Sequence, residues 1–316
     1  MTKNNIEVSI YCVTYNHEKY IKKTIESFLD QKTNFDFEIL IGEDCSLDDT
    51  GKIVDEYVNK YPNKIKKISS DKNVGGKKNF LRLHDHANGK YVALCEGDDY
   101  WIDPYKLQKQ YDYMENNIDC SFCSHSGYII SNNIRKNMKL YKKNRKVAFE
   151  DVVYNKVLLP TASLFYRKSY MDNPPDFYFN SDVLDYPMKL ILISKGYGYY
   201  LNEKMSVYRR HVKGSWTMRV NSSKENILNH YNKLINTLKA YNEYTNFKYE
   251  DIINEVILMR KIDVMSLEKD FKVLKKDRKY IELIKKMPIK IKLKYMFKIN
   301  FPKFFDFLRR VKNKYF

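Results

Sequence analysis

Apolar and polar residues follow two alternating patterns in the first part of the chain. Short runs rich in β-branched and aromatic residues indicate strands, and they are Val8–Val13, Phe37–Ile41, Lys64–Ile68 and Tyr91–Cys95. Between these runs, apolar residues recur every three or four positions, as on one face of a helix. The order βαβαβαβ predicts an α/β fold with a mostly parallel central sheet flanked by helices.

A mixed pattern follows Trp101. Asp103 and Pro104 are typical of a helix start, so we expect a helix from there to about Met114. The further elements expected are strands at Cys120–Ile130, Lys146–Phe149 and Ser163–Arg167, a helix from Tyr186 to Gly196, and two short strands around Tyr199 and Val207.

Helical periodicity dominates the chain from Lys224 to about Lys286. We therefore expect a domain boundary near residue 220. Residues 1–220 would form the α/β domain, and residues 221–316 a helical extension rich in basic residues.

The chain has few features of a secreted or membrane-spanning protein. No apolar run approaches the roughly 18 residues that cross a bilayer, and the first residues do not resemble a signal peptide, so we expect a cytoplasmic protein. The five cysteines are an odd number, which favours free thiols. Cys120, Cys123 and His125 have the spacing of half a zinc site, although buried thiols on a strand are the simpler interpretation.

The formal net charge of +18 predicts a polyanionic partner. In Met287–Phe316, nine basic residues accompany a single acid, Asp306. We expect this segment to attach the protein to the anionic inner face of the cell membrane. The alternative is a basic helix packed on the first domain.

Two acidic segments each follow a predicted strand. Glu43 and Asp44 come after the second strand, and Glu96, Asp98 and Asp99 come after the fourth. Because parallel strands present their carboxyl ends at one edge of a sheet, both segments should face one cleft. Clustered carboxylates repel one another unless a cation is shared, so the pattern predicts Mn²⁺ or Mg²⁺ on a diphosphate, with two solvated acidic turns as the alternative.

Several motifs resemble, in order and spacing, the inverting family-2 glycosyltransferases of GT-A fold. They are Val13–His17, Glu43–Ser46 with Asp48 and Thr50, Asn73–Gly76 with Asn79, Glu96–Asp99, Asp185–Pro187, Tyr208–His211 and Gly214–Trp216. The last three are similar to segments of bacterial members that build surface polysaccharides. The resemblance covers residues 6–217 and implies transfer of a sugar from a nucleotide-sugar, with UDP as the expected nucleotide, to a hydroxyl of a saccharide or lipid-linked acceptor.

The resemblance implies roles for the matching residues. Thr14 and Tyr15 would line the pocket for base and ribose, Asp44 would accept a hydrogen bond from uracil, Glu96 would bind the ribose hydroxyls and Asp98 the metal. The remaining donor-binding residues implied are Asn16, Glu43, Asn73, Gly75, Gly76, Gly97 and Arg209. Glu43 and Glu96 stand where the family more often has aspartate, which keeps the charge.

Asp185 is the expected catalytic base, because it precedes a predicted helix and would take the proton from the acceptor hydroxyl. The competing candidate is Asp182, and the structural alternative for Asp185 is helix capping. His211 is a second candidate metal ligand or a structural residue. Of Arg209 and Arg210, at most one faces the phosphates, and Trp216 would form a sugar platform or an ordinary packing contact.

The alternatives are two other enzyme classes and one class of binding protein. A dinucleotide-dependent oxidoreductase would show G-x-G-x-x-G after the first strand, which is absent. A nucleotidyltransferase would use similar carboxylates but usually has a glycine-rich basic signature there. A non-catalytic nucleic-acid-binding protein would fit the +18 charge, but the acidic sheet edge would repel phosphates, so no nucleic acid is expected.

Overall fold

The computed structural model describes residues 6–301 except 133, 139–140, 156–158, 213–214, 269–275 and 287–288, and also residues 304, 307 and 308. The chain divides into two compact units. The first comprises Met1–Phe179 and Val183–Ser215, and the second comprises Asn180–Asp182 and Trp216–Phe316.

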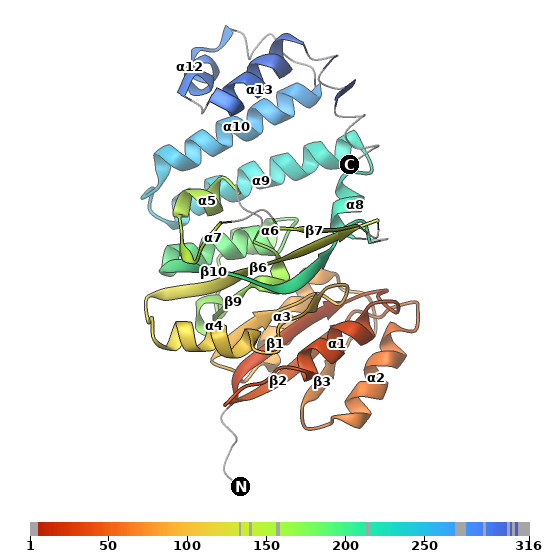
Figure 1. Ribbon diagram of the computed structural model, residues 1–316. Coiled ribbons are helices and arrows are strands. Elements are labelled where there is room, and N and C mark those ends of the chain that lie inside the picture. The colour runs from red at the N-terminus through yellow and green to blue at the C-terminus, as the bar shows by residue number, and fades with distance from the viewer. Residues whose placement is uncertain are drawn as a thin grey trace. The chain divides into compact units, whose positions relative to one another are not determined.

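The first unit is built on a mixed sheet, which in the described part of the chain has ten strands (Figure 1). Its strands are β1 (Ile6–Thr14), β2 (Asp36–Glu43), β3 (Ile65–Ile68), β4 (Tyr91–Leu94), β5 (Tyr100–Trp101), β6 (Cys120–Ser131), β7 (Ile134–Asn137), β8 (Arg145–Val147), β9 (Phe165–Arg167) and β10 (Tyr197–Arg209). Its helices are α1 (Ile21–Leu29), α2 (Thr50–Lys60), α3 (Gly76–His86), α4 (Lys106–Glu115), α5 (Phe149–Val153), α6 (Asp176–Asn180) and α7 (Asp185–Lys195), with short 3₁₀ turns at Thr161–Ser163 and Lys168–Met171.

The strand order is β3-β2-β1-β4-β9-β6-β10-β5. The first four of these strands are parallel, as the alternation of strands and helices predicts. Strand β9 pairs antiparallel with both β4 and β6 and so joins this half to the parallel pair β6 and β10. The carboxyl ends of β1, β2 and β4 therefore lie along one edge, where ligands bind in sheets of this kind.

Alternate residues of β1 face two different layers of the core. Ile10 belongs to a buried cluster that includes Ile25 of α1, Val54 of α2 and Leu107 of α4. On the other face, the ring of Tyr11 packs edge-on against Phe80 of α3, with 5.5 Å between ring centroids. Burial on both faces explains why most residues of β1 are apolar.

Three expected elements differ from the structure. The segment around Tyr199 and Val207 is one strand, β10, whose pairing with β6 has register shifts, so its central residues do not show a regular alternation. The strand expected at Lys146–Phe149 ends at Val147, and α5 begins at Phe149. The helix expected to start at Asp103 starts at Lys106, because the Asp103 carboxylate accepts a hydrogen bond from the Tyr105 amide at 2.8 Å and closes a turn.

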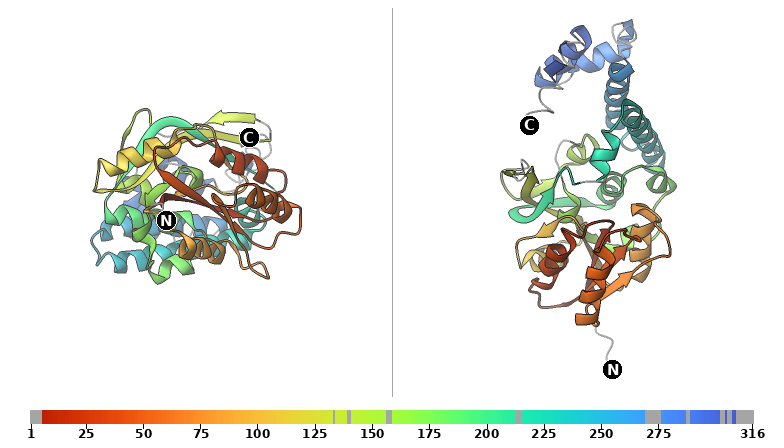
Figure 2. Two further views of the ribbon diagram at one scale, coloured as in Figure 1. Left: turned by 90° about the horizontal axis from the view of Figure 1, so that it is seen from below. Right: turned by 90° about the vertical axis from the view of Figure 1, so that its right-hand side faces the viewer.

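The second unit is helical, as the periodicity after Lys224 predicts. Its helices are α8 (Trp216–Val220), α9 (Lys224–Tyr244), α10 (Glu250–Glu268), α12 (Arg278–Lys286) and α13 (Ile289–Asn300). The Ser223 hydroxyl caps α9 by accepting a hydrogen bond from the Asn226 amide at 3.0 Å. Helices α9 and α10 run side by side (Figure 2), and within the described residues no helix is both long and apolar enough to span a bilayer.

A lysine is fully buried in the first unit. Lys106 donates a hydrogen bond to Gln110 Oε1 at 2.7 Å, and its Nζ lies 4.1 Å from the centre of the Trp101 ring. Burial lowers the pKa of Lys106 from 10.5 to about 7. At neutral pH the buried amine is therefore only partly protonated.

Replacement of Gly89 by alanine should destabilise the protein. An added Cβ would lie 2.4 Å from the Ser9 amide nitrogen in β1, and backbone atoms cannot move aside without disturbing the sheet. We expect a loss of about 1–3 kcal/mol in the free energy of unfolding, measured by urea denaturation. Gly51→Ala is the control, because its nearest neighbour is 3.6 Å away and alanine favours a helix, so equal losses in both variants would contradict this account.

The buried Lys106 should make stability depend on pH. Between about pH 7 and 10.5 the unfolded chain holds a proton at this position that the folded chain lacks, so the wild type gains stability as pH rises. Relative to Lys106→Met, the wild-type Tm should therefore increase from pH 7 to pH 10. Lys52→Met is the control, because Lys52 is exposed, and its Tm difference from the wild type should not change with pH. If the Tm difference between Lys106→Met and the wild type is also independent of pH, the expectation is refuted.

Candidate functional site

The turn after β1 is joined to the turn after β2. Asn16 has a left-handed backbone with φ of 56°, which asparagine tolerates better than most residues. Its amide donates to Ser46 Oγ at 3.0 Å, and its side-chain oxygen accepts from the Leu47 amide at 2.8 Å. Thr14 is buried beside His17, whereas Tyr15 is 38% exposed and so accessible to a ligand.

Glu43 and Asp44 have different surroundings. Glu43 accepts hydrogen bonds from the amides of Cys45 and Ser46 and closes its own turn. Asp44 accepts from the amides of Val74 and Gly75 at 2.9 and 2.8 Å, one on each oxygen. Each Asp44 oxygen keeps a second lone pair, so Asp44 can still accept from a ligand.

The segment Asn73–Gly76 leads into α3. The Asn73 side chain accepts from the Gly75 amide, and Gly75 has φ of 82°, a conformation that favours glycine. Gly76 is the first residue of α3. Arg82, which no sequence motif indicated, lies one helical turn after Asn79, and its guanidinium is 3.5 Å from Asp44.

Three carboxylates converge after β4. Glu96, Asp98 and Asp99 each offer an oxygen within 4.8 Å of the others. Their backbone can approach β1 because Gly97 has no side chain: a Cβ there would lie 2.4 Å from Thr14 Oγ1. The Gly97 amide donates to the Val13 carbonyl at 2.9 Å, which fixes the segment at the end of β1.

Mutual repulsion and burial change the acidity of this cluster. Burial, together with the negative charges of Asp98 and Asp185, raises the pKa of Glu96 to about 8. Burial and the same kind of repulsion raise the pKa of Asp99 well above its usual range, against the opposing effect of Arg209. The pKa of His17, whose ring lies 4.0 Å from Asp98, is lowered by burial.

Arg209 joins the end of β10 to the acidic segment. Its amide donates to Asp99 Oδ1 at 2.8 Å, and its guanidinium donates to the Asp98 carbonyl. The guanidinium also lies over the rings of Tyr20 and Tyr100, 5.0 and 4.5 Å from their centres. Arg209 thus positions the segment, and sequence alone did not predict the aromatic residues that hold it.

Asp185 is the first residue of α7 and does not cap it, since the cap position is Leu184. Its carboxylate pairs with Lys189 at 2.8 Å, and the Lys189 side chain is almost fully buried. Asp185 and Glu96 line one small cavity, together with apolar residues such as Val13 and Met188. The structure therefore brings the expected base to the same cavity as Glu96, one member of the acidic cluster. Because residues four apart are neighbours on the surface of a helix, the sequence already indicated the Asp185–Lys189 ion pair.

The remaining candidates lie in other surroundings. Asp182 belongs to the second unit and pairs with His230 at 2.9 Å, and the Trp216 ring packs edge-on against His230. His211 is exposed, has φ of 62°, and its Nδ1 lies 2.9 Å from Ser131 Oγ. It is outside the group formed by the three carboxylates, so its role as a metal ligand stays a prediction.

The cysteines do not form a zinc site within the described residues. Cys120 and Cys123 are free and buried, and the only group of three or more candidate ligands found in this part of the chain is the acidic one. His125 is also buried, and its Nδ1 lies 2.7 Å from the carbonyl of Ser126.

The acidic group fits a divalent cation. All three candidate ligands are carboxylates, which Mg²⁺ and Mn²⁺ prefer. Asp99 Oδ2 is buried without a hydrogen-bond partner, and burial together with the negative charges of Asp98 and Asp185 raises the pKa of Glu96. A cation shared by the three carboxylates would bind the unpaired Asp99 oxygen and offset the repulsion between the negative charges.

The model of glycosyl transferase family 2 matches residues 9–173, a span that includes most of β1, all of β2 and β4, and the acidic segment. The chain belongs to glycosyl transferase family 2. Of the residues expected to act, the match includes all those from Thr14 to Asp98, while Asp185, Arg209 and His211 lie beyond it.

Relatives and solved structures agree with this membership. The uncharacterized protein Rv1520 of Mycobacterium tuberculosis is 34% identical over 212 residues, which are 66% of this chain and 60% of that protein. TuaG of Bacillus subtilis, named for teichuronic acid biosynthesis, is 28% identical over 64% of this chain and 78% of its own length. The structure of Staphylococcus aureus TarS with UDP-GlcNAc has a TM-score of 0.61 and 18% identity, covering 90% of this chain and 77% of that one, which supports a GT-A fold.

Replacement of Asp98 should weaken cation binding. In Asp98→Asn the side chain keeps its shape but loses its charge, so Mn²⁺ affinity measured with UDP present should fall about tenfold or more. Free Mn²⁺ can be followed by electron paramagnetic resonance. Asp55→Asn is the control, because Asp55 is an exposed acid of α2 paired with Lys67. Equal Mn²⁺ affinity in the two variants would rule out Asp98 as a ligand.

Proposed function

We propose that the protein is a metal-dependent inverting glycosyltransferase of hexosyltransferase type that moves a sugar from a UDP-sugar to an acceptor hydroxyl in bacterial surface polysaccharide or glycolipid synthesis. The observation that carries the proposal is the convergence of Glu96, Asp98 and Asp99 at the carboxyl end of β4, with Asp185 lining the same cavity as Glu96. Family membership supports the same reaction class.

Donor binding is assigned to the edge formed by β1, β2 and the start of α3. Tyr15 is exposed enough to contact the base, and Asp44 has lone pairs for an imide N–H of uracil. Arg82 and the amides of Val74 and Gly75 keep the Asp44 carboxylate in one orientation. Glu96 is assigned to the ribose hydroxyls, at the border between the nucleoside and the cavity.

Mn²⁺ or Mg²⁺ would be held by Asp98, with Glu96 and Asp99 beside it and His211 as a further candidate. When bound, the cation supplies positive charge to the diphosphate that leaves with the nucleotide. Arg209 holds the Asp98 carbonyl and one Asp99 carboxylate oxygen, so the carboxylates would meet the cation in a preset geometry.

Asp185 is proposed as the base. The acceptor oxygen attacks the anomeric carbon on the face opposite the diphosphate, the bond to the diphosphate breaks, and Asp185 takes the hydroxyl proton. Lys189 holds one Asp185 oxygen at 2.8 Å, which leaves the other free to face the acceptor. A single displacement of this kind inverts the anomeric configuration without a covalent enzyme intermediate.

The alternatives considered from the sequence receive less support. The family match favours sugar transfer over nucleotidyl transfer. A nucleic-acid-binding function would place phosphates against three carboxylates at the edge where ligands are expected, which is unfavourable unless cations are bound.

Asp185→Asn should abolish most turnover and keep donor binding. We expect hydrolysis and transfer rates with UDP-sugars and Mn²⁺ to fall about 10²- to 10⁴-fold, because the amide cannot accept the proton. The rise in Tm caused by UDP and Mn²⁺ should persist, since the nucleotide residues are unchanged.

Asp182→Asn is the matched control, because Asp182 is an aspartate three residues earlier that pairs with His230 in the second unit. It should keep near wild-type turnover. If Asp185→Asn stays active while Asp182→Asn is inactive, the base is assigned to the wrong aspartate. If UDP with Mn²⁺ leaves the Tm unchanged in the wild type, the proposed donor is wrong.

A further inference from the structure

The last described helix, α13, has two apolar faces. Tyr295 and Ile299 are buried in a cluster with Ile262 of α10 and with Leu283 and Ile284 of α12. This packing accounts for one face of α13 and holds the helix in the second unit. It does not account for the other apolar residues of the segment.

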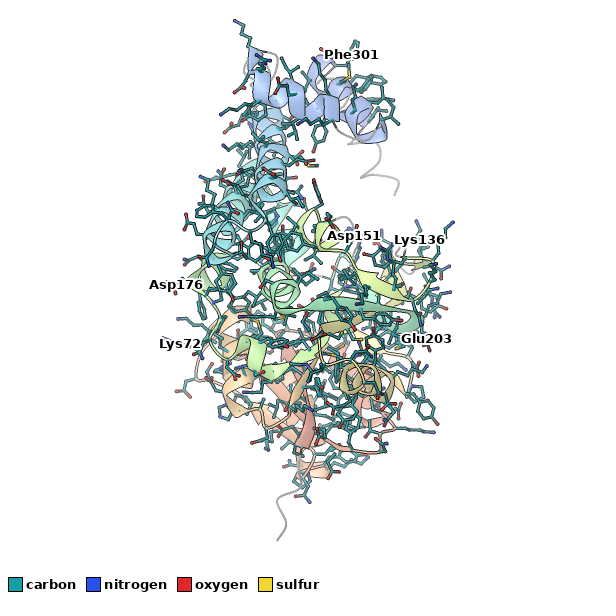
Figure 3. The ribbon with its side chains drawn as sticks, turned by 90° about the vertical axis from the view of Figure 1, so that its left-hand side faces the viewer. Lys72, Lys136, Asp151, Asp176, Glu203 and Phe301 are labelled. Carbon is teal, nitrogen blue, oxygen red and sulfur yellow. The ribbon has the colours of Figure 1, made fainter. Side chains whose placement is uncertain are left out.

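The second face is a row of exposed large apolar side chains. Ile289, Leu293 and Phe301 are 65%, 57% and 59% exposed, and Met296 and Phe297 lie between them at helical spacing. Phe304, Phe307 and Leu308 continue the series and are also exposed. We call these eight residues the apolar row. Phe301, which directly follows α13, is labelled in Figure 3.

The row is unusual for this protein. Among the described residues, 18 large apolar side chains are exposed, and eight of them lie between residues 289 and 308. The other ten are scattered between residues 15 and 247. Isolated exposed apolar residues are normal on a protein surface, but a contiguous set indicates an interaction site.

The charge of the segment restricts its partner. Met287–Phe316 contains nine basic residues and one acid, and Lys285 and Lys286 at the end of α12 are exposed. The side chains of most basic residues after Met287 lie outside the described set, so only their positive charge is considered. Two copies of such a segment would repel each other, which disfavours self-association.

Nucleic acid would satisfy the positive charge but not the apolar row. The four phenylalanines of the row could stack on bases, but Ile289, Leu293, Met296 and Leu308 are aliphatic and cannot. An anionic bilayer surface satisfies both features, since phosphates attract the lysines while the apolar side chains enter the boundary between headgroups and acyl chains.

We propose that α13, together with Phe301, Phe304, Phe307 and Leu308, forms an amphipathic anchor whose apolar row inserts into the surface of an anionic lipid membrane. This extends the electrostatic attachment expected from the sequence, because insertion makes binding depend on specific apolar side chains as well as on charge. The inference does not rest on the proposed glycosyltransferase activity.

Flotation of the full-length protein with vesicles tests the anchor. With phosphatidylcholine vesicles containing phosphatidylglycerol, the wild type should float, and with pure phosphatidylcholine it should float much less. The double variant Leu293→Ser, Phe301→Ser should bind the anionic vesicles about tenfold or more weakly, because two inserted side chains are lost while every charge is kept.

Phe247→Ser is the matched control, since Phe247 is 55% exposed in the same unit but outside the row. It should float like the wild type, and all variants should keep the wild-type circular dichroism spectrum. Equal flotation of the double variant and the wild type would show attraction by charge alone and overturn the proposal. The proposal would also be overturned if the wild type does not bind vesicles but forms a dimer that the double variant cannot form. A wild-type complex with single-stranded DNA that the double variant cannot form, again without vesicle binding, would overturn it as well.

Discussion

The first unit is organised around three carboxylates that repel one another. Glu96, Asp98 and Asp99 are kept within 4.8 Å of one another although burial already disfavours the charged forms of Glu96 and Asp99. Their segment is held by its backbone: Thr24 of α1 donates to the carbonyls of Gly97 and Asp99, and Arg209 donates to the Asp98 carbonyl. Because backbone contacts carry the restraint, most carboxylate oxygens remain available to a ligand.

The same restraint explains features far apart in the chain. Gly97 permits the contact with β1, and the end of β10 reaches the segment through Arg209. Tyr20 and Tyr100 hold the Arg209 guanidinium from two further positions. A strand end, a helix and a distant arginine are thus coupled to one short acidic turn, so a change in any of them should alter the geometry of the cluster.

Much of the first half of the fold could be predicted from the sequence, because parallel strands buried on both faces produce long apolar runs that are easily recognised. Strands β1 to β4 and the acidic turns after β2 and β4 were confirmed. The second half was harder. Strand β10 has register shifts and therefore lacks a regular alternation, and it was wrongly divided into two strands.

The functional site was likewise predicted only in part. Motifs indicated which acids would gather at the edge, but not what each acid contacts, because contacts such as Arg82 with Asp44 depend on the tertiary fold. The Asp185 and Lys189 pair is an exception, since it follows from helical spacing alone.

The hydrogen bonds of each acid separate structural roles from chemical ones. Glu43 uses its oxygens on the amides of its own turn, so its charge mainly stabilises the chain after β2. Asp44 uses one lone pair on each oxygen, and Asp99 leaves Oδ2 with no partner in the protein. A buried carboxylate oxygen without a partner destabilises the fold unless a ligand binds it, so Asp99 Oδ2 is the atom of this cluster that most favours a bound cation.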